Sequence, residues 1–137
     1  MEQITINATI NSSIENVWKF FTEPEHIKQW NTASEDWHTT AAKNDLREGG
    51  RFCYRMEAKD GSFGFDFSGS YEKVKHYDHI IYKLDDDRRV NITFHKLGGD
   101  VTQVVEVFDA ENENSIEMQR TGWQAILDNF KNYAQFS

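Results

Sequence analysis

Cysteine and proline are almost absent from this sequence, which contains only Cys53 and Pro24. One cysteine cannot form an internal disulfide, and it cannot complete a zinc site built from several cysteine and histidine ligands. No run of about 18 apolar residues occurs, so no membrane-spanning helix is predicted. The first residues lack a basic stretch followed by an apolar one. We therefore expect no signal peptide and a soluble, cytoplasmic protein.

Basic residues are outnumbered, with 15 Lys and Arg against 23 Asp and Glu, for a net charge of −8. Nucleic acids and anionic membranes attract clustered Lys and Arg, and the sequence has no such run. It therefore predicts neither as a partner. The 137 residues contain no linker, repeat or low-complexity segment, so we expect a single domain over residues 1–137.

Two apolar patterns divide the chain. From Gln3 to Ala110 apolar residues mostly alternate with polar ones, which is typical of β-strands. From Asn114 to Phe136 they recur at steps of three and four, which predicts one amphipathic helix of roughly 30 Å. Gly122, beside Trp123, is expected to let this helix approach the sheet closely.

Two short helices are predicted after a first strand at Gln3–Ile10. Ser12 to Glu15 has the pattern of a capping box, in which a serine oxygen and the Glu15 carboxylate satisfy free amides at a helix start. That helix is expected to end near Thr22. Pro24 suits the first turn of a second helix that runs through Trp30.

The segment after Trp30 predicts about six antiparallel strands joined by hairpins. The strands are expected at Asp36–Ala42, Arg51–Ala58, Phe63–Tyr71, from Ile80 to Leu84, from Val90 to Phe94, and at Val101–Phe108. Gly- and Asp-rich turns separate them, including an Asp-Gly hairpin at Lys59–Ser62. Consecutive hairpins favour an antiparallel meander.

Several short motifs occur in a characteristic order. They are Ala8–Trp18, Ile27–Trp30, Asp45–Phe52, Asp60-Gly61, Gly69–Tyr71 and Gly122–Leu127. In this order the chain resembles the START-like (SRPBCC) superfamily of the birch-pollen allergen. Within it, the chain is similar to the activator of heat-shock protein 90 ATPase homologues, often called polyketide-cyclase-like. One departure is Lys75–Asp78, where the family often has a proline and a charged pair.

The resemblance implies an α+β helix-grip fold. In this fold a curved antiparallel sheet of about six to seven strands wraps around a long C-terminal helix, with two short helices after the first strand. It also implies a cavity between the sheet and that helix, in which small apolar molecules bind.

Aromatic residues are the strongest candidates for a ligand site, and they make up 14% of the chain. Pockets for small molecules are mostly apolar with a few polar groups. The residues expected to converge are Trp37, Phe52, Tyr54, Phe65, Phe67, Tyr71, Tyr82, Phe94, Trp123 and Leu127. A solid core would bury the same residues, so the pattern alone leaves both interpretations open.

Acid–base candidates are few. Glu106 lies on a strand with apolar residues on both faces, so it projects either into the cavity or into solvent. His38 follows Trp37 near the expected pocket rim, where it is either an acid–base group or a polar surface residue. Asp66 poses the same question as Glu106 on a strand face that otherwise carries Gly64, Ser68 and Ser70.

The remaining reactive side chains favour no chemistry. Cys53 has no predictable histidine partner and is interpreted as a strand residue. His76 and His79 flank an exposed turn with no supporting ligands, so no metal site is predicted. Gly49-Gly50 is interpreted as a turn because no helix follows it to hold a phosphate. We expect no cofactor.

Three hypotheses of different classes follow. The first is a protein that binds a small hydrophobic or aromatic ligand without chemistry. The second is an enzyme of cyclase or hydrolase type that uses Glu106, His38 or a pocket tyrosine. The third is a co-chaperone that stimulates the ATPase of heat-shock protein 90. The sequence identifies neither the ligand nor the oligomeric state.

Overall fold

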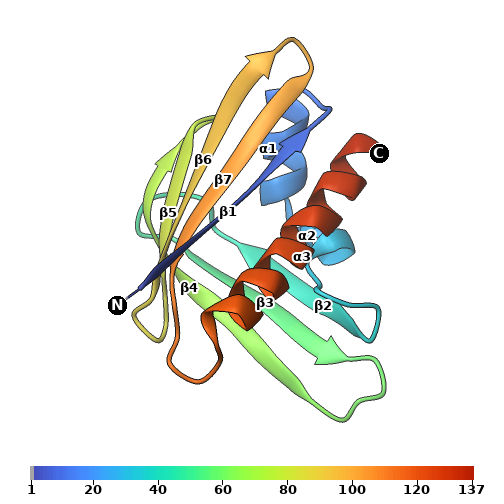
Figure 1. The fold of residues 1–137 in the computed structure, drawn as a ribbon, viewed down its shortest axis with the longest axis vertical. Helices are drawn as coiled ribbons and strands as arrows, with labels where there is room; N and C mark the ends of the chain where they lie inside the picture. Colours follow the sequence, from blue (N-terminus) through green and yellow to red (C-terminus); the bar gives the residue numbers. More distant parts are fainter. Residues whose placement is uncertain (1) are drawn as a thin grey trace.

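A computed structural model describes residues 2–137 and shows one sheet with three helices (Figure 1). The strands are β1 (Gln3–Ile10), β2 (Trp37–Asn44), β3 (Arg51–Ala58), β4 (Gly64–Lys75), β5 (His79–Leu84), β6 (Arg89–Gly98) and β7 (Val101–Asp109). The helices are α1 (Ile14–Thr22), α2 (Pro24–Trp30) and α3 (Ile116–Gln135). The predicted helix-grip fold is confirmed.

The sheet is antiparallel throughout, and its order is β1-β7-β6-β5-β4-β3-β2. It curls so that its concave face looks toward α3, which packs mainly along β1, while α2 packs on β2 (Figure 1). The two edge strands are therefore each accompanied by a helix. No helix within residues 2–137 is long and apolar enough to cross a membrane.

Side-chain caps fix the helix starts. The Ser13 hydroxyl accepts a hydrogen bond from the Asn16 amide at 3.2 Å, so Ser13 is the N-cap of α1. The predicted capping box beginning at Ser12 was therefore wrong by one residue, and Glu15 lies too early in the helix to complete it. Pro24 opens α2 as expected. The Ser115 hydroxyl caps α3 by accepting from the Met118 amide at 3.1 Å.

The packed part of the core lies under β1, β6 and β7. Ile4, Ile6 and Ile10 alternate on the inner face of β1 and are almost fully buried. They belong to the same apolar cluster as Leu127 and Phe130 of α3, which are 2% and 0% exposed. This side of the interior is filled, as a solid core requires.

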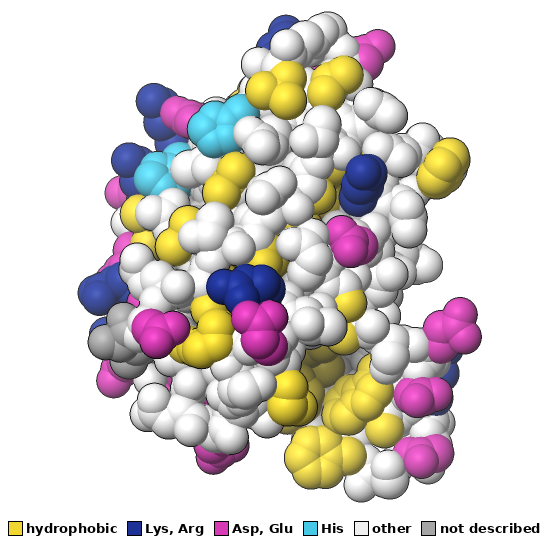
Figure 2. Space-filling model, in the orientation of Figure 1, with side chains coloured by type: hydrophobic (Ala, Val, Ile, Leu, Met, Phe, Trp, Pro, Cys, Tyr) yellow, Lys and Arg dark blue, Asp and Glu magenta, His cyan; other side chains and the backbone are white. Residues whose placement is uncertain are grey.

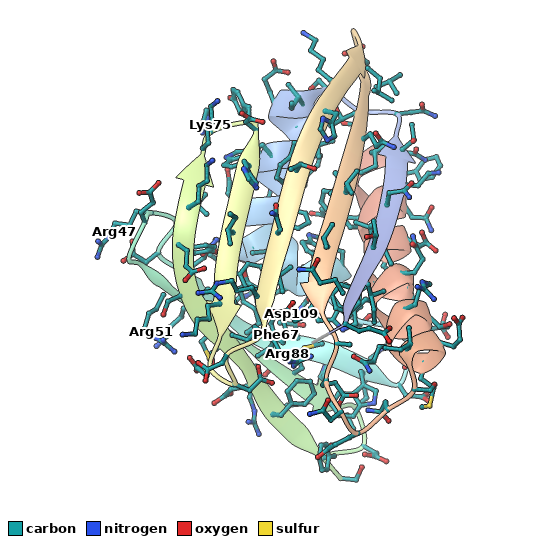
Figure 3. The ribbon with its side chains drawn as sticks, turned by 60° about the vertical axis from the view of Figure 1, so that its left-hand side comes forward. Arg47, Arg51, Phe67, Lys75, Arg88 and Asp109 are labelled. Atoms are coloured by element: carbon teal, nitrogen blue, oxygen red, sulfur yellow. The ribbon has the colours of Figure 1, made fainter. Side chains whose placement is uncertain are left out.

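The outer face of the sheet is charged. Arg51 pairs with Asp85 at 2.9 Å, and Arg55 pairs with both Glu57 at 3.0 Å and Asp66 at 3.3 Å. Figure 3 shows Arg47, Arg51 and Lys75 extending away from the helices. Arg55 and Glu57 therefore point away from the cavity. Asp66 lies on this face too, so it cannot act in the cavity.

The glycines have different roles. Gly61 has a φ of 77° in the β3–β4 hairpin, which explains the Asp-Gly pair at this turn. At Gly122, a methyl group would meet nothing within 4 Å. The expectation that Gly122 permits close helix–sheet packing was therefore wrong. The buried contacts of α3 come instead from Leu127, Phe130 and Ala134.

Candidate functional site

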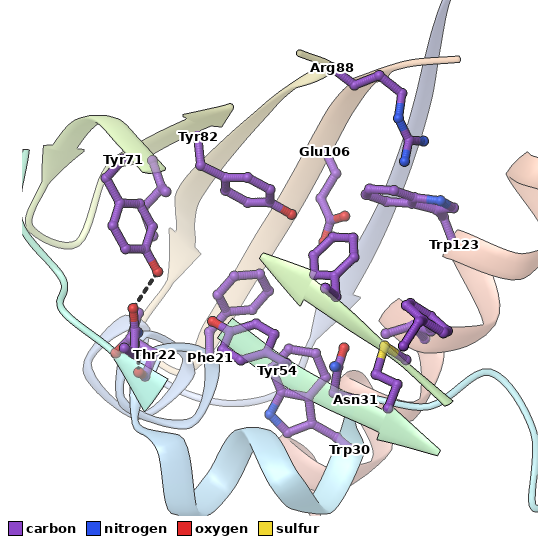
Figure 4. Close-up of a pocket in the computed structure, with 16 residues that line it drawn as sticks. Phe21, Thr22, Trp30, Asn31, Tyr54, Tyr71, Tyr82, Arg88, Glu106 and Trp123 are labelled. Atoms are coloured by element: carbon purple, nitrogen blue, oxygen red, sulfur yellow. Dashed lines mark hydrogen bonds between the residues drawn. The ribbon is translucent and has the colours of Figure 1, made fainter. Parts of the chain in front are cut away.

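A cavity of about 260 Å³ lies between α3 and the concave face of the sheet (Figure 4). Its walls come from every layer of the fold. The lining residues are Phe21, Thr22, Trp30, Asn31, Asn44, Tyr54, Met56, Phe65, Phe67, Tyr71, Ile80, Tyr82, Arg88, Glu106, Trp123 and Ile126.

The hollow arises because α3 packs against β1 and stands away from β3 and β4. Register pairs Tyr54 with Phe67 and Met56 with Phe65, so all four side chains point to the same inner face. Tyr54 and Phe67 are only half-buried, although equivalent positions on β1 are fully covered. The inner faces of β3 and β4 therefore bound a space instead of a packed core.

One end of the cavity reaches the surface. Phe65 lines the cavity and is 41% exposed, and the neighbouring Phe63 is 64% exposed. Trp37 of β2 contacts both rings, with centroid distances of 6.0 Å to Phe63 and 5.9 Å to Phe65. Figure 2 shows hydrophobic side chains gathered at the lower end of the molecule, where the surface is hollowed. These three aromatic residues form an apolar mouth.

Glu106 of β7 projects into the cavity and is only 8% exposed. Its neighbours across the sheet are Ile6 and Ile92, both nearly fully buried, and its carboxyl group makes no hydrogen bond to any of residues 2–137. Burial without a partner disfavours the charged form and raises the pKa of Glu106 to about 8. The direction of Glu106, which the sequence left open, is inward.

Three tyrosines supply hydroxyl groups to the walls. The Tyr71 hydroxyl donates to Asn44 Oδ1 at 2.5 Å, and burial raises its pKa to about 12. Burial likewise raises the pKa of Tyr54 and of Tyr82, and the negative charge of Glu106 adds to the effect at Tyr82. All three hydroxyls are therefore neutral near pH 7 and serve as hydrogen-bonding groups.

The polar groups are separated along the cavity. Arg88, Glu106 and Trp123 lie at one end, and Tyr71 and Thr22 lie at the other (Figure 4). Arg88 Nε lies 2.8 Å from the Asp86 carboxylate, so its charge is already paired. The side chain of Thr22 donates to the Trp18 carbonyl at 2.7 Å. Of the carboxyl and guanidinium groups in the lining, Arg88 has a carboxylate partner and Glu106 has none among residues 2–137.

The sequence model of the family described as "Activator of Hsp90 ATPase homolog 1-like protein" matches residues 11–135. The chain belongs to this family. The matched residues include both short helices, the strands from β2 to β7 and almost all of α3. Every residue that lines the cavity lies within this range.

Two solved structures are similar over nearly the whole chain. An AHSA1-like protein from Aeromonas hydrophila is 47% identical, with a TM-score of 0.90 over 96% of this chain and 91% of that one. Chr148 from Cytophaga hutchinsonii is 50% identical, with a TM-score of 0.84 over 96% and 90%. No curated protein matches the chain.

The Aha1 dimer from Colwellia psychrerythraea shares the fold at 14% identity, with a TM-score of 0.77 over 99% of this chain and 98% of that one. At this identity the likeness concerns the fold alone. The dimeric state is that of the Colwellia protein.

Six of the ten aromatic and aliphatic residues predicted for the ligand site line the cavity of this family member. They are Tyr54, Phe65, Phe67, Tyr71, Tyr82 and Trp123. Phe52, Phe94 and Leu127 are instead packed in the core, each at most 3% exposed. Trp37 lies at the mouth. The lining residues that sequence reasoning missed include Phe21 and Trp30, which lie on the two short helices, and Arg88, which follows a turn.

The other candidates lie outside the cavity. His38 is exposed beside a shallow surface depression that also contains Lys59 and Asn129, so it cannot act as an acid or base on a molecule in the cavity. Cys53 lies half-buried on the outer face of β3. His76 packs its ring against Trp18 at 5.3 Å. Within residues 2–137 no three His, Cys, Asp or Glu side chains are placed to hold a metal ion.

Proposed function

We propose that this protein binds a small hydrophobic or aromatic molecule in the cavity between α3 and the sheet. The observation that carries this proposal is a cavity of about 260 Å³ walled largely by aromatic side chains and open at one end. Burying an apolar ligand against such walls contributes roughly 25 cal/mol for each Å² removed from water. Binding alone requires no catalytic group.

Two measurements on the purified protein test the proposal. Native mass spectrometry detects any small molecule retained during purification, and thermal shift measures stabilisation by a panel of apolar aromatic compounds. We expect the melting temperature to rise with ligand concentration, because a ligand that binds only the folded state stabilises it. No retained mass and no stabilisation by any compound would refute the proposal.

A filled cavity provides the matched control. Ile126 of α3 lines the cavity, whereas Ile81 of β5 lies on the outer face between two residues that point inward. Ile126→Trp should abolish ligand stabilisation, because the indole occupies the space. Ile81→Trp adds the same ring outside the cavity and should leave ligand stabilisation intact. Equal responses of the two variants would place the ligand elsewhere.

Acid–base catalysis by Glu106 is the second candidate function. It is favoured by a buried, unpartnered carboxyl group in the cavity with a pKa near 8, since general acids and bases work best when their pKa lies near the operating pH. Incubation of each ligand with wild-type protein and with Glu106→Gln, followed by mass analysis, tests it. Conversion by the wild type alone would support a reaction, and an unchanged ligand mass in both would exclude it for that compound.

A further inference from the structure

Glu106 brings one uncompensated acidic group into an otherwise apolar space. Glu106 is 8% exposed as a residue, and its carboxyl group, which faces the cavity, makes no hydrogen bond or ion pair with any of residues 2–137. An isolated carboxylate in such a place is costly unless a proton or a cation accompanies it. Arg88 lies at the same end of the cavity, but its ion pair is with Asp86 and not with Glu106.

None of the other ionisable groups around the cavity neutralises the Glu106 carboxylate. They are Tyr54 from β3, Tyr71 from β4, Tyr82 from β5 and Arg88 from the segment before β6. The tyrosines are neutral near pH 7 because their pKa values are raised. Arg88 is held by Asp86 at 2.8 Å. The helices α1, α2 and α3 contribute no ionisable side chain to the lining.

Aromatic rings surround the same end of the cavity. Trp123 stacks on Phe108 with a centroid distance of 3.9 Å and meets Phe67 edge to face at 6.1 Å. Tyr82 packs against Phe67 at 6.4 Å, and Figure 4 shows Tyr82, Glu106 and Trp123 directed into the same space. Aromatic faces attract organic cations through their quadrupoles, and this attraction strengthens when water is excluded.

We propose that the ligand of this cavity is an organic cation, with its ammonium group against the Glu106 carboxylate and its apolar body among Phe67, Tyr82 and Trp123. This inference rests on the proposed binding function and names the chemical class of its ligand. In the free protein a proton neutralises Glu106, and the bound cation replaces that proton. The overall charge of −8 adds a favourable long-range attraction for cations.

A pair of isosteric probes tests the charge. Benzyltrimethylammonium carries a permanent positive charge, and neopentylbenzene has the same shape with carbon in place of nitrogen. Binding of each is followed by NMR through the Trp123 indole resonance from about pH 6 to pH 9. Because Glu106 loses its proton on binding the cation, affinity for benzyltrimethylammonium should rise about tenfold per pH unit up to the Glu106 pKa and then level off. Affinity for neopentylbenzene should not rise with pH.

Two charge-removing variants locate the effect. Glu106→Gln should weaken benzyltrimethylammonium binding at least tenfold at pH 8 and should not weaken neopentylbenzene binding. Glu48→Gln removes the same charge from an exposed loop residue and should leave both affinities unchanged.

The outcomes separate the two proposals. Binding of neopentylbenzene but not of the cation, or a cation affinity that ignores pH and Glu106→Gln, overturns the cation inference and leaves hydrophobic binding intact. Binding of neither probe, together with no response to the apolar panel, overturns both.

Discussion

The pKa of Glu106 links one side chain to the pH dependence of folding. The pKa is about 8 in the folded protein against 4.5 ordinarily, so the folded state holds a proton that the unfolded state releases. The stability contributed by this proton is fully present below about pH 4.5 and is lost as pH rises toward 8. Wild-type stability should therefore fall by roughly 3 kcal/mol between about pH 5 and pH 8 through this group alone.

Urea unfolding of wild type and Glu106→Gln across this pH range measures the effect. Glutamine does not titrate, so the difference in free energy of unfolding between the two proteins should shift in favour of the variant as pH rises. Glu48→Gln serves as the control and should follow the wild-type curve. Parallel curves for wild type and Glu106→Gln would show that Glu106 titrates normally in the folded state.

Within α3, Gly122 weakens the helix without a packing benefit. A methyl group there would meet nothing within 4 Å, and the position lies in the helix interior. Alanine restricts the unfolded chain and favours the helix, so Gly122→Ala should raise the free energy of unfolding by roughly 0.5–1 kcal/mol in urea denaturation.

At Gly50, unlike at Gly122, we expect substitution by alanine to destabilise the protein in urea denaturation. A methyl group there would lie 2.1 Å from the Asp45 carbonyl oxygen, which is backbone and cannot move aside. Gly50→Ala should therefore lower the free energy of unfolding. Stabilisation by both substitutions, or by neither, would contradict the packing described at these two glycines.

The start of α1 offers a third test. The Ser13 hydroxyl accepts from the Asn16 amide, so Ser13→Ala should cost about 1 kcal/mol in the free energy of unfolding. Glu15 makes no capping bond, and Glu15→Gln should change stability far less. A larger loss from Glu15→Gln than from Ser13→Ala would favour the capping box that begins at Ser12.

Secondary structure was the part most readable from the sequence, because local patterns specify it. The strand Arg51–Ala58 has the predicted bounds, since its apolar alternation is strict and turns flank it on both sides. β7 shows the limit. Its inward face carries Thr102, Val104, Glu106 and Phe108, but the other face carries three valines. The alternation of apolar residues therefore did not show which face points inward. The pairing of Glu106 with Ile6, more than 90 residues away, fixes the direction.

The position of the cavity depends on the whole molecule. Phe52 and Tyr54 share the inner face of β3, yet Phe52 is 2% exposed in the core while Tyr54 lines the cavity. The difference lies in where α3 crosses the sheet, which the composition of β3 does not encode. For the same reason, Phe94 and Leu127 were predicted to line the cavity but lie in the packed part of the core. Arg88 lines the cavity but was not predicted to do so.

This uneven packing predicts an uneven stability across the sheet. All four inward residues of β1 are buried, whereas Thr39 is the only buried residue of β2. Regions with few buried apolar contacts open locally at a lower free energy than the global transition. In hydrogen exchange, amides of β1, β6 and β7 should exchange only through global unfolding, and those of β2 to β4 should exchange faster through local opening.

Ligand binding should reduce the difference in hydrogen-exchange rate between the two halves of the sheet. A molecule in the cavity adds contacts to Tyr54 and Phe67 on β3 and β4, and it leaves the packed side of the core unchanged. Saturating ligand should therefore slow exchange most in β3 and β4, and the Ile126→Trp variant should show that slowing without ligand, because its indole fills the same space. Uniform protection of all seven strands in the free protein would mean that the cavity does not weaken this half of the sheet.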